Sequence, residues 1–336
     1  MSNSRVLLGF SGGIDSCAAV EILRSQGYTV TALTIDTTGD QTMLKQAQQR
    51  AAKLGVEWHV YDAREVFKRE IIDYFCSEYM AGHTPAPCTR CNTHIKWRIL
   101  AKVADEMGIY HIATGHYFSI KKLGDRYYVT KGVDERKDQS YYLWGLSQEI
   151  LQRALTPMGG MIKSKIKSDN KQRESMGVCF LQGKPYGEFI TGQGYDIRYG
   201  DVVTRSGDVI GRHQGIALYT IGQRRGVGIP EGLRVVDIDA EKGNIIVGRS
   251  FELIKKKLYI NSCNIVDIRE LLQSSDVTIK IRGIGRNPEL PVTIKPCDGG
   301  YVITAQDEVY APAKGQPLVF YRNNLVIGGG IVVDFD

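Results

Sequence analysis

Short apolar runs alternate with helical patterns through the first half of the chain. The apolar runs have strand length and are rich in β-branched and aromatic side chains, and they cover residues 6–10, 28–35, 57–60 and 110–114. Apolar side chains at helical spacing fill the intervals, with predicted helices up to Gly27, from about 44 to 54, from 65 to 80 and from 93 to 107. Strand and helix in alternation predict an α/β domain whose parallel sheet is covered on both faces.

The pattern changes after the middle of the chain. Residues 158–183 are Lys-rich with glycines at both ends, which is typical of an exposed, mobile connector. From Tyr195 onward, short segments of alternating polarity are punctuated by glycines, as in barrels and sandwiches. We therefore expect an α/β domain over residues 1–183, a small β-rich domain over 184–250 and a β barrel over 251–336.

Composition narrows the class of protein. The chain has 336 residues, of which 43% are hydrophobic and 24% charged, as in soluble globular proteins and unlike disordered or coiled-coil chains. Apolar runs fall short of the ~18 residues that span a bilayer, and seven cysteines form no dense framework, so we expect reduced thiols in the cytoplasm and no membrane contact. A net charge of +6 permits an anionic partner such as nucleic acid, and fits an ordinary basic surface equally well.

The segment Ser-Gly-Gly-Ile-Asp-Ser at residues 11–16 lies between the first predicted strand and the first predicted helix. Two glycines allow a tight turn, so that backbone N–H groups, the positive end of the helix and the hydroxyls of Ser11 and Ser16 can face an anion. A plain turn with a helix cap would use the same small residues. No Gly-x4-Gly-Lys-Ser/Thr sequence is present, so a lysine of the Walker type is missing from this loop.

This loop resembles the pyrophosphate loop of ATP pyrophosphatases. The resemblance implies cleavage of ATP between the α and β phosphates and adenylation of a carbonyl oxygen. Asp15 would then lie beside the departing pyrophosphate and a magnesium ion. The resemblance gives the type of reaction and leaves the acceptor open.

Cys88 and Cys91 stand just before the helix expected to begin near Thr93, with Arg90 between them. A thiol ahead of a helix N-terminus and beside a cation should have a lowered pKa and be a good nucleophile, and Cys91 is the stronger candidate. The Cys-x2-Cys spacing, with His83 and His94 nearby, leaves a zinc site as an alternative, although a second compact pair of ligands is missing from the sequence.

Cys179 has apolar neighbours on both sides, and by itself this pattern favours a buried core cysteine. The whole set of motifs, however, resembles one family, the tRNA-specific 2-thiouridylases. The resemblance rests on the phosphate loop, Gly82–Pro87 with Cys91–Asn92 and Ile95–Lys96, Ala113–Tyr117, Lys137–Tyr141, Ser175–Phe180, Gly211–Gly215, Tyr219–Gly226 and Gly328–Gly330. It implies an adenine-nucleotide α-hydrolase-like domain with a parallel sheet, a small central domain and a C-terminal barrel that together hold a tRNA.

The resemblance also implies roles for particular residues. ATP would adenylate the C2 oxygen of the wobble uridine (U34), Cys179 would carry a persulfide, and Cys91 would be the nucleophile that completes transfer and forms a disulfide with Cys179. ATP would be bound by Gly9, Phe10, Ser11, Gly12, Gly13, Ile14, Asp15, Ser16, Ile35 and Gly115. The tRNA and its flipped base would be bound by Ala86, Pro87, Cys88, His116, Lys137, Asp138, Gln139, Arg282, Gly283 and Gln316. ATP and Mg²⁺ would be needed, with a sulfur donor protein, either a cysteine desulfurase or a relay protein.

The chain departs from the family pattern at Ala86, where Asn is usual, and in a shorter segment between Pro157 and Ser175, which together indicate a divergent paralogue. Two other functions stay open: a non-catalytic tRNA-binding relative, and an adenylating enzyme with another acceptor. Lysines also gather in the connector, and charge runs of this kind favour a solvated face over a phosphate-binding track; they are Lys163, Lys165, Lys167 and Lys171.

Overall fold

The computed structural model describes residues 4–166, 177–225, 229–283 and 287–336. By its internal contacts the chain divides into two compact units. The first unit comprises residues 1–71, 88–174 and 324–327, and the second comprises residues 72–87, 175–323 and 328–336. The predicted connector lysines Lys167 and Lys171 lie outside the described residues.

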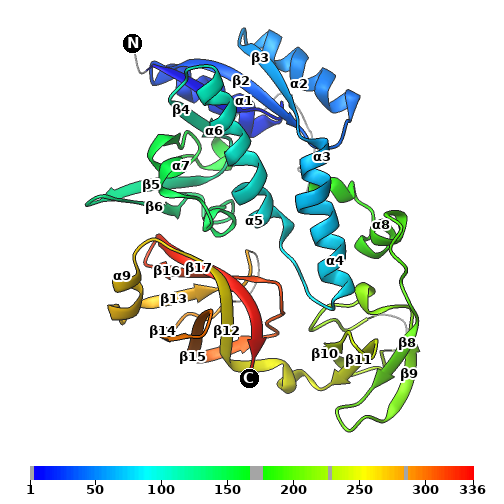
Figure 1. The fold of residues 1–336 in the computed structure, drawn as a ribbon. Coiled ribbons are helices and arrows are strands. Elements are labelled where there is room, and N and C mark those ends of the chain that lie inside the picture. The colour runs from blue at the N-terminus through cyan, green and yellow to red at the C-terminus, as the bar shows by residue number, and fades with distance from the viewer. Residues whose placement is uncertain (1–3, 167–176, 226–228, 284–286) are drawn as a thin grey trace. The chain divides into compact units, whose positions relative to one another are not determined.

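The first unit is built on a five-stranded sheet in which every strand pair is parallel. Its order is β3-β2-β1-β4-β7, with β1 at Arg5–Gly9, β2 at Thr29–Asp36, β3 at Glu57–Asp62, β4 at His111–Thr114 and β7 at Ala154–Leu155. Val6, Leu7 and Leu8 are completely buried, because side chains alternate between two faces and both faces are covered. The α/β prediction with a parallel sheet is therefore confirmed (Figure 1).

Helices follow the strands of the first unit. They are α1 (Ile14–Ser25), α2 (Gln41–Lys53), α3 (Arg64–Phe67), α6 (Trp97–Glu106) and α7 (Gln148–Arg153). Ala19, Val20 and Leu23 of α1 pack with Val6 and Leu8 of the sheet, and the apolar spacing along α1 explains this contact. Asp40 caps α2 by accepting hydrogen bonds from the backbone N–H groups of the first turn.

The helix that carries Cys88 and Cys91 begins earlier than the sequence predicts. Helix α5 covers Pro87–Cys91, a π-helical turn follows at Asn92–Lys96, and α6 continues directly at Trp97. Proline fits the first position of a helix, because its missing N–H would have no intrahelical partner there. The expected start near Thr93 is wrong for this reason, and Cys91 lies within the helical segment instead of ahead of it.

A hairpin extends the first unit. Strands β5 (Phe118–Leu123) and β6 (Arg126–Lys131) are antiparallel, and β6 also pairs with Leu325 and Val326 at the start of β17 (Leu325–Phe335). The last strand of the structure thus supplies residues to the first unit before it continues in the second.

The second unit contains two antiparallel-rich sheets. The smaller has the order β10-β11-β8-β9, with β8 at Gly200–Val203, β9 at Val209–His213, β10 at Arg234–Asp239 and β11 at Asn244–Gly248. Val202, Val235, Ile245 and Val247 form its core. The unit also holds helix α4 (Tyr74–Met80), preceded by a π-helical turn at Lys68–Asp73, and helix α8 (Tyr186–Gly192).

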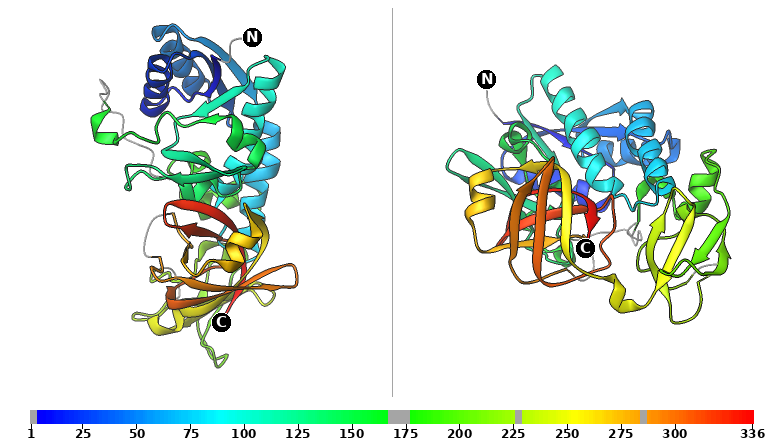
Figure 2. Two further views of the ribbon diagram at one scale, coloured as in Figure 1. Left: turned by 90° about the vertical axis from the view of Figure 1, so that its left-hand side faces the viewer. Right: turned by 60° about the horizontal axis from the view of Figure 1, so that its bottom comes forward.

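The strands of the C-terminal sheet curl round on themselves (Figure 2, yellow to red). Leu258, Ile279, Ile303 and Phe320 of these strands are buried. Its order is β13-β16-β17-β12-β15-β14, with β12 at Ile254–Ile265, β13 at Val277–Lys280, β14 at Val292–Cys297, β15 at Gly300–Tyr310 and β16 at Pro317–Arg322. Helix α9 covers Ile268–Gln273. The two ends of this order, β13 and β14, approach each other, as in a barrel.

The described start of the connector, residues 158–166, packs more closely on the first unit than the lysine pattern suggests. Met158 is completely buried, Met161 and Ile166 pack on the core of the first unit, and a short 3-10 turn forms at Lys163–Lys165. The expectation of an exposed, mobile connector is therefore wrong for residues 158–166. No helix in the described part of the chain is long and apolar enough to cross a membrane.

Candidate active site

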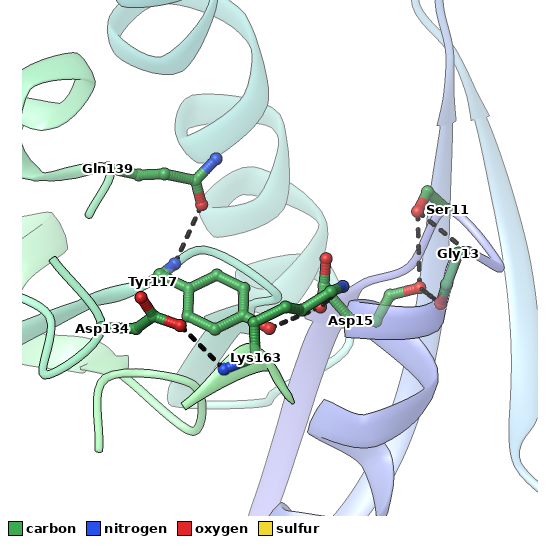
Figure 3. Close-up of polar contacts among 8 residues, drawn as sticks. Ser11, Gly13, Asp15, Tyr117, Asp134, Gln139 and Lys163 are labelled. Atoms are coloured by element: carbon green, nitrogen blue, oxygen red, sulfur yellow. Dashed lines mark hydrogen bonds and ion pairs between the residues drawn. The ribbon is translucent and has the colours of Figure 1, made fainter. Parts of the chain in front are cut away.

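The phosphate loop turns tightly between β1 and α1. Gly12 has a φ of +70°, and a side chain there would put its Cβ 2.8 Å from the Cα of Ala47 on α2, so only glycine fits. The Ser16 hydroxyl donates to the Gly13 carbonyl at 2.9 Å, and the Gly13 N–H donates to the Ser11 hydroxyl at 3.2 Å (Figure 3). Hydroxyls therefore gather beside the positive end of a 12-residue helix, which suits an anion.

Asp15, in the first turn of α1, is held from two other segments (Figure 3). The Tyr117 hydroxyl donates to Asp15 Oδ1 at 2.6 Å, and the Lys163 Nζ donates to the same oxygen at 2.5 Å. The other carboxylate oxygen, Oδ2, has no hydrogen-bond partner among the described residues, and the Asp15 side chain keeps 36% of its surface exposed. Asp15 is thus oriented through one oxygen while the second can bind a ligand.

The loop lies where the order of the sheet reverses. From β1 the chain proceeds to β2 and β3 on one side, whereas β4 pairs with β1 on the other. In open parallel sheets, ligands bind outside the carboxyl ends of the strands at such a point. Gly115 follows β4 and touches the loop, since a Cβ there would lie 3.1 Å from the Ser16 backbone nitrogen. Ile35 is the residue before the last one, Asp36, of the neighbouring strand β2.

The residues from Gly9 to Ser16 therefore share one edge of the sheet with Ile35 and Gly115. Oxygen ligands suit magnesium, which is bound in proteins by one or two carboxylates together with substrate phosphates and water. Asp15 supplies such a carboxylate beside the anion loop, so the residues fit this ion. In the described part of the chain, no group of three or more His, Cys, Asp or Glu side chains is placed to hold a metal by itself.

The first thiol pair lies on one helical segment of the first unit. Cys88 is exposed and Cys91 is partly buried. Arg90 between them donates to the backbone carbonyl of Glu70 at 2.7 Å and to its carboxylate at 3.0 Å. The guanidinium is thus shared with an acidic partner, and Arg69 with Arg90 lowers the pKa of Glu70. This pairing reduces the cationic influence on the thiols that the sequence suggested.

Cys179 is exposed in the second unit, on a 3-10 turn at Cys179–Leu181. Its neighbour Phe180 is buried instead, with its ring centre 5.2 Å from Phe75 and 5.1 Å from Phe189. Cys179 is therefore not the core cysteine that its apolar neighbours favour by themselves. The apolar side chain anchors the turn, and the thiol is left accessible to reagents.

Three candidate RNA-binding residues, Lys137, Asp138 and Gln139, are connected by hydrogen bonds to residues near the turn after β4. Gln139 accepts a hydrogen bond from the Tyr117 N–H at 2.9 Å, and its own N–H donates to the Tyr117 carbonyl at 2.9 Å. Asp138 accepts from the N–H groups of Gly132 and Ser140, and the Lys137 N–H donates to the Asp134 carbonyl. The segment 137–139 is therefore fastened to the residues that orient Asp15.

His116 packs its ring against Trp97 and shares a 2.7 Å hydrogen bond between its Nδ1 and the Thr114 hydroxyl. Burial, with a smaller contribution from Lys96, holds the pKa of His116 well below its usual range. The imidazole is consequently neutral near pH 7, and a contact with RNA here would be a hydrogen bond and not an ion pair.

Of the other candidates for binding tRNA, Cys88 belongs to the first unit. The rest belong to the second unit and are Ala86, Pro87, Arg282, Gly283 and Gln316. Gln316 Oε1 is buried without a hydrogen-bond partner in the described structure, and the adjacent Gly315 lies against His83 and Thr84, just before Ala86 and Pro87. A polar atom buried in this way indicates a missing ligand or water. Arg282 donates to the carbonyls of Tyr310 and Ala311, and Gly283 follows it.

Sequence reasoning missed Lys163, Tyr117 and Asp134 as site residues. Lys163 was placed on a solvated face, yet its side chain is only 17% exposed and pairs with Asp15. A signal was present, because Met161, Ile162 and Ile166 interrupt the lysine run and indicate a packed segment. Lys165 is exposed, as the pattern predicts.

Comparison with known proteins agrees with this architecture along the whole chain. Residues 4–183 match the model of a tRNA methyl transferase HUP domain, residues 188–249 that of a tRNA methyl transferase PRC-barrel domain, and residues 255–332 that of an aminomethyltransferase beta-barrel domain. The tRNA-specific 2-thiouridylase MnmA 1 of Bacteroides fragilis is 41% identical, covering 99% of this chain and 98% of the relative. The chain belongs to the tRNA-specific 2-thiouridylase family. The resemblance inferred from the motifs is thereby confirmed.

Two further relatives of this family match over similar lengths. MnmA 2 of Phocaeicola vulgatus is 39% identical, covering 99% of both chains. MnmA 1 of Clostridium botulinum strain Loch Maree is 36% identical, covering 98% of this chain and 99% of the relative. Such coverage leaves no large part of the 2-thiouridylase architecture unmatched here.

Proposed function

We propose that this protein is an ATP-dependent tRNA-uridine 2-sulfurtransferase that thiolates the wobble uridine, U34. The observation that carries the proposal is Asp15, held by one oxygen beside an anion-binding loop at the switch point of a parallel sheet. Full-length similarity to curated 2-thiouridylases supports the acceptor.

In the first step ATP binds with its phosphates on the loop of residues 9–16, between Ile35 and Gly115. The uridine C2 oxygen attacks the α phosphorus, and pyrophosphate leaves. This converts a poor leaving group, a carbonyl oxygen of a urea-like ring, into AMP, which is a good one. Asp15 would hold magnesium through its second carboxylate oxygen, and the ion supplies charge neutralisation for the phosphates when it is bound.

The second step uses the thiols. A persulfide on Cys179 attacks C2 with its terminal sulfur, and AMP departs. The Cys91 thiolate then attacks the Cys179 sulfur, which releases 2-thiouridine and leaves a Cys91–Cys179 disulfide. Formation of that bond requires the two Cα atoms to approach within ~4.4–6.8 Å. The exposure of Cys179 supports its role as the carrier, since a donor must reach it.

The tRNA must present its target base outside the stack, because the C2 oxygen cannot otherwise reach the α phosphate. Ala86, Pro87 and Cys88 would line the base site. Lys137, Asp138, Gln139, His116, Arg282, Gly283 and Gln316 would contact the tRNA. The unpartnered Oε1 of Gln316 supports this assignment, because an RNA hydroxyl or amino group could donate to it.

The persulfide must come from a sulfur donor protein, a cysteine desulfurase or a relay protein, in a reducing compartment such as the cytoplasm. We assign the nucleotide chemistry to a domain over residues 1–183, followed by a central domain over 184–250 and a barrel over 251–336.

Reconstitution tests the proposal. Purified protein, unmodified tRNA, ATP, Mg²⁺ and a persulfide source should yield 2-thiouridine, measured by mass spectrometry of tRNA nucleosides. Asp15→Asn keeps the size of the side chain and should lower tRNA-dependent pyrophosphate release about a hundredfold or more. Normal tRNA binding without any thiolation or pyrophosphate release would instead identify a non-catalytic relative, and pyrophosphate release with another acceptor would identify a different adenylating enzyme.

A further inference from the structure

The phosphate loop carries no cation of its own. Residues 9–16 contain glycines, hydroxyls, two apolar side chains and one carboxylate, but neither lysine nor arginine. Departing pyrophosphate bears several negative charges, which proteins neutralise with Lys or Arg in addition to backbone N–H groups. A basic side chain from elsewhere in the chain would add to the neutralisation that the backbone N–H groups and magnesium supply.

Two basic side chains contact the loop region in the described part of the chain. Arg50 of α2 donates to the Gly12 carbonyl, so its guanidinium is engaged with the backbone of the turn. Lys163 instead pairs with a side chain, Asp15, and its Nζ lies 6.0 Å from the centre of the Tyr117 ring (Figure 3). A rotation of the Lys163 side chain alone can therefore move its ammonium group from Asp15 toward a phosphate on the loop.

The backbone that carries Lys163 is fixed on the first unit. The Lys163 N–H donates to Asp134 Oδ2 at 2.9 Å, and the Val133 N–H donates to the Gly159 carbonyl at 2.9 Å. Met158 is completely buried nearby in sequence. A flexible four-carbon stem thus extends from a firm base to the N-terminal end of α1, which is the arrangement that a phosphate-binding lysine requires.

We propose that Lys163 is the catalytic cation of this site, which contacts the departing pyrophosphate and waits on Asp15 in the absence of nucleotide. This inference rests on the proposed adenylation. As the uridine oxygen bonds to the α phosphorus, the bond from that phosphorus to the bridging oxygen breaks, and the bridging oxygen keeps the electron pair. Lys163 stays protonated and donates a hydrogen bond to the charge that develops there.

Binding measurements test the contact directly. Inorganic pyrophosphate and AMP are titrated separately into the full-length protein with Mg²⁺ by calorimetry. Lys163→Met should weaken pyrophosphate at least tenfold and leave AMP within twofold. Lys165→Met, which removes an equal charge from the exposed end of the same turn, should alter neither. Equal pyrophosphate affinity in the two variants would overturn the proposal.

Kinetics give a second readout. Lys163→Met should lower tRNA-dependent pyrophosphate release about a hundredfold, and Lys163→Arg, which keeps a cation on the same turn, should stay within tenfold of the parent protein. A Lys163 that serves only to orient Asp15 would leave pyrophosphate affinity unchanged when the titration is repeated without Mg²⁺, and this outcome counts against the proposal. Thermal unfolding checks that each variant is folded.

The two proposals fail separately. Lys163-dependent pyrophosphate binding in a protein that never releases pyrophosphate from ATP would overturn the function and support the lysine contact. If the parent protein thiolates tRNA, and the Lys163→Met and Lys165→Met variants bind and release pyrophosphate equally well, only the lysine contact is overturned.

Discussion

The phosphate loop and the thiol-bearing segments are built in opposite ways. The loop lies within one unit, and two residues from distant segments fix its carboxylate through short hydrogen bonds. The thiols are divided between units, with Cys91 in the first and Cys179 on an exposed turn of the second. In the proposed mechanism, adenylation uses side chains of the first unit, whereas sulfur transfer uses one thiol from each unit. The two should consequently be separable by mutation.

The largest expected effect comes from Cys179→Ser. Removing the carrier sulfur should abolish 2-thiouridine formation, while ATP binding and tRNA-dependent pyrophosphate release stay within twofold of the parent protein. Nucleoside mass spectrometry and a pyrophosphate assay measure the two steps on one sample. Cys297→Ser removes another exposed thiol of the second unit and is the matched control. Loss of pyrophosphate release in Cys179→Ser would contradict the separation.

An intermediate effect is expected from Tyr117→Phe. The substitution keeps the ring beside Lys163 but deletes the hydroxyl that donates to Asp15 Oδ1. One such hydrogen bond is worth about 1 kcal/mol, or roughly fivefold to tenfold in a rate. Pyrophosphate release should fall by this amount. Alkylation of Cys179 by iodoacetamide should proceed at the parental rate, and a changed rate would show that the loop and the thiol are coupled.

The smallest effect concerns stability in acid and compares one histidine in each unit, His116 and His213. Burial lowers the pKa of His116 in the first unit and of His213 in the second. Below about pH 6.5 the unfolded chain binds protons that the folded imidazoles do not, so stability present at neutral pH is lost as the pH falls, by up to about 1.4 kcal/mol per pH unit for each group.

Urea unfolding between pH 7 and 5.5 measures this loss. His116→Gln should make the pH dependence shallower for the first unit, and His213→Gln should do so for the second. If the free energy of unfolding depends on pH in both variants as it does in the parent protein, other groups control the loss of stability in acid. His213 Nδ1 accepts a hydrogen bond from the Gly215 N–H, and its Nε2 donates to the Gly243 carbonyl. Because both bonds are lost, His213→Gln should lower the free energy of unfolding at pH 7 more than His116→Gln does.

The loop was readable from sequence because all its determinants are local. A strand, two glycines, a carboxylate and a helix follow one another within a few residues, and the parallel sheet that displays them follows from alternating periodicities. The partners of Asp15 were not readable in this way. Tyr117 and Lys163 are distant in sequence, and only the folded sheet brings them to one oxygen.

The difference at the first thiol pair has another origin. The sequence predicts a helix start near Thr93, whereas Pro87 occupies the first position of a helix that already includes Cys91. The apolar flanks of Cys179 by themselves favour burial, and on the short turn it is Phe180 that is buried while Cys179 is exposed. Residue types suggest the chemistry of these thiols, whereas local geometry decides which of them is exposed.

The pairing of β6 with Leu325 and Val326 has a consequence for biosynthesis. On the ribosome, the N-terminal part of the protein emerges long before these residues are translated, so β6 keeps one open edge throughout most of elongation. Open strand edges recruit other chains. The nascent polypeptide therefore exposes this edge of β6 to pairing with other chains until Leu325 and Val326 are translated.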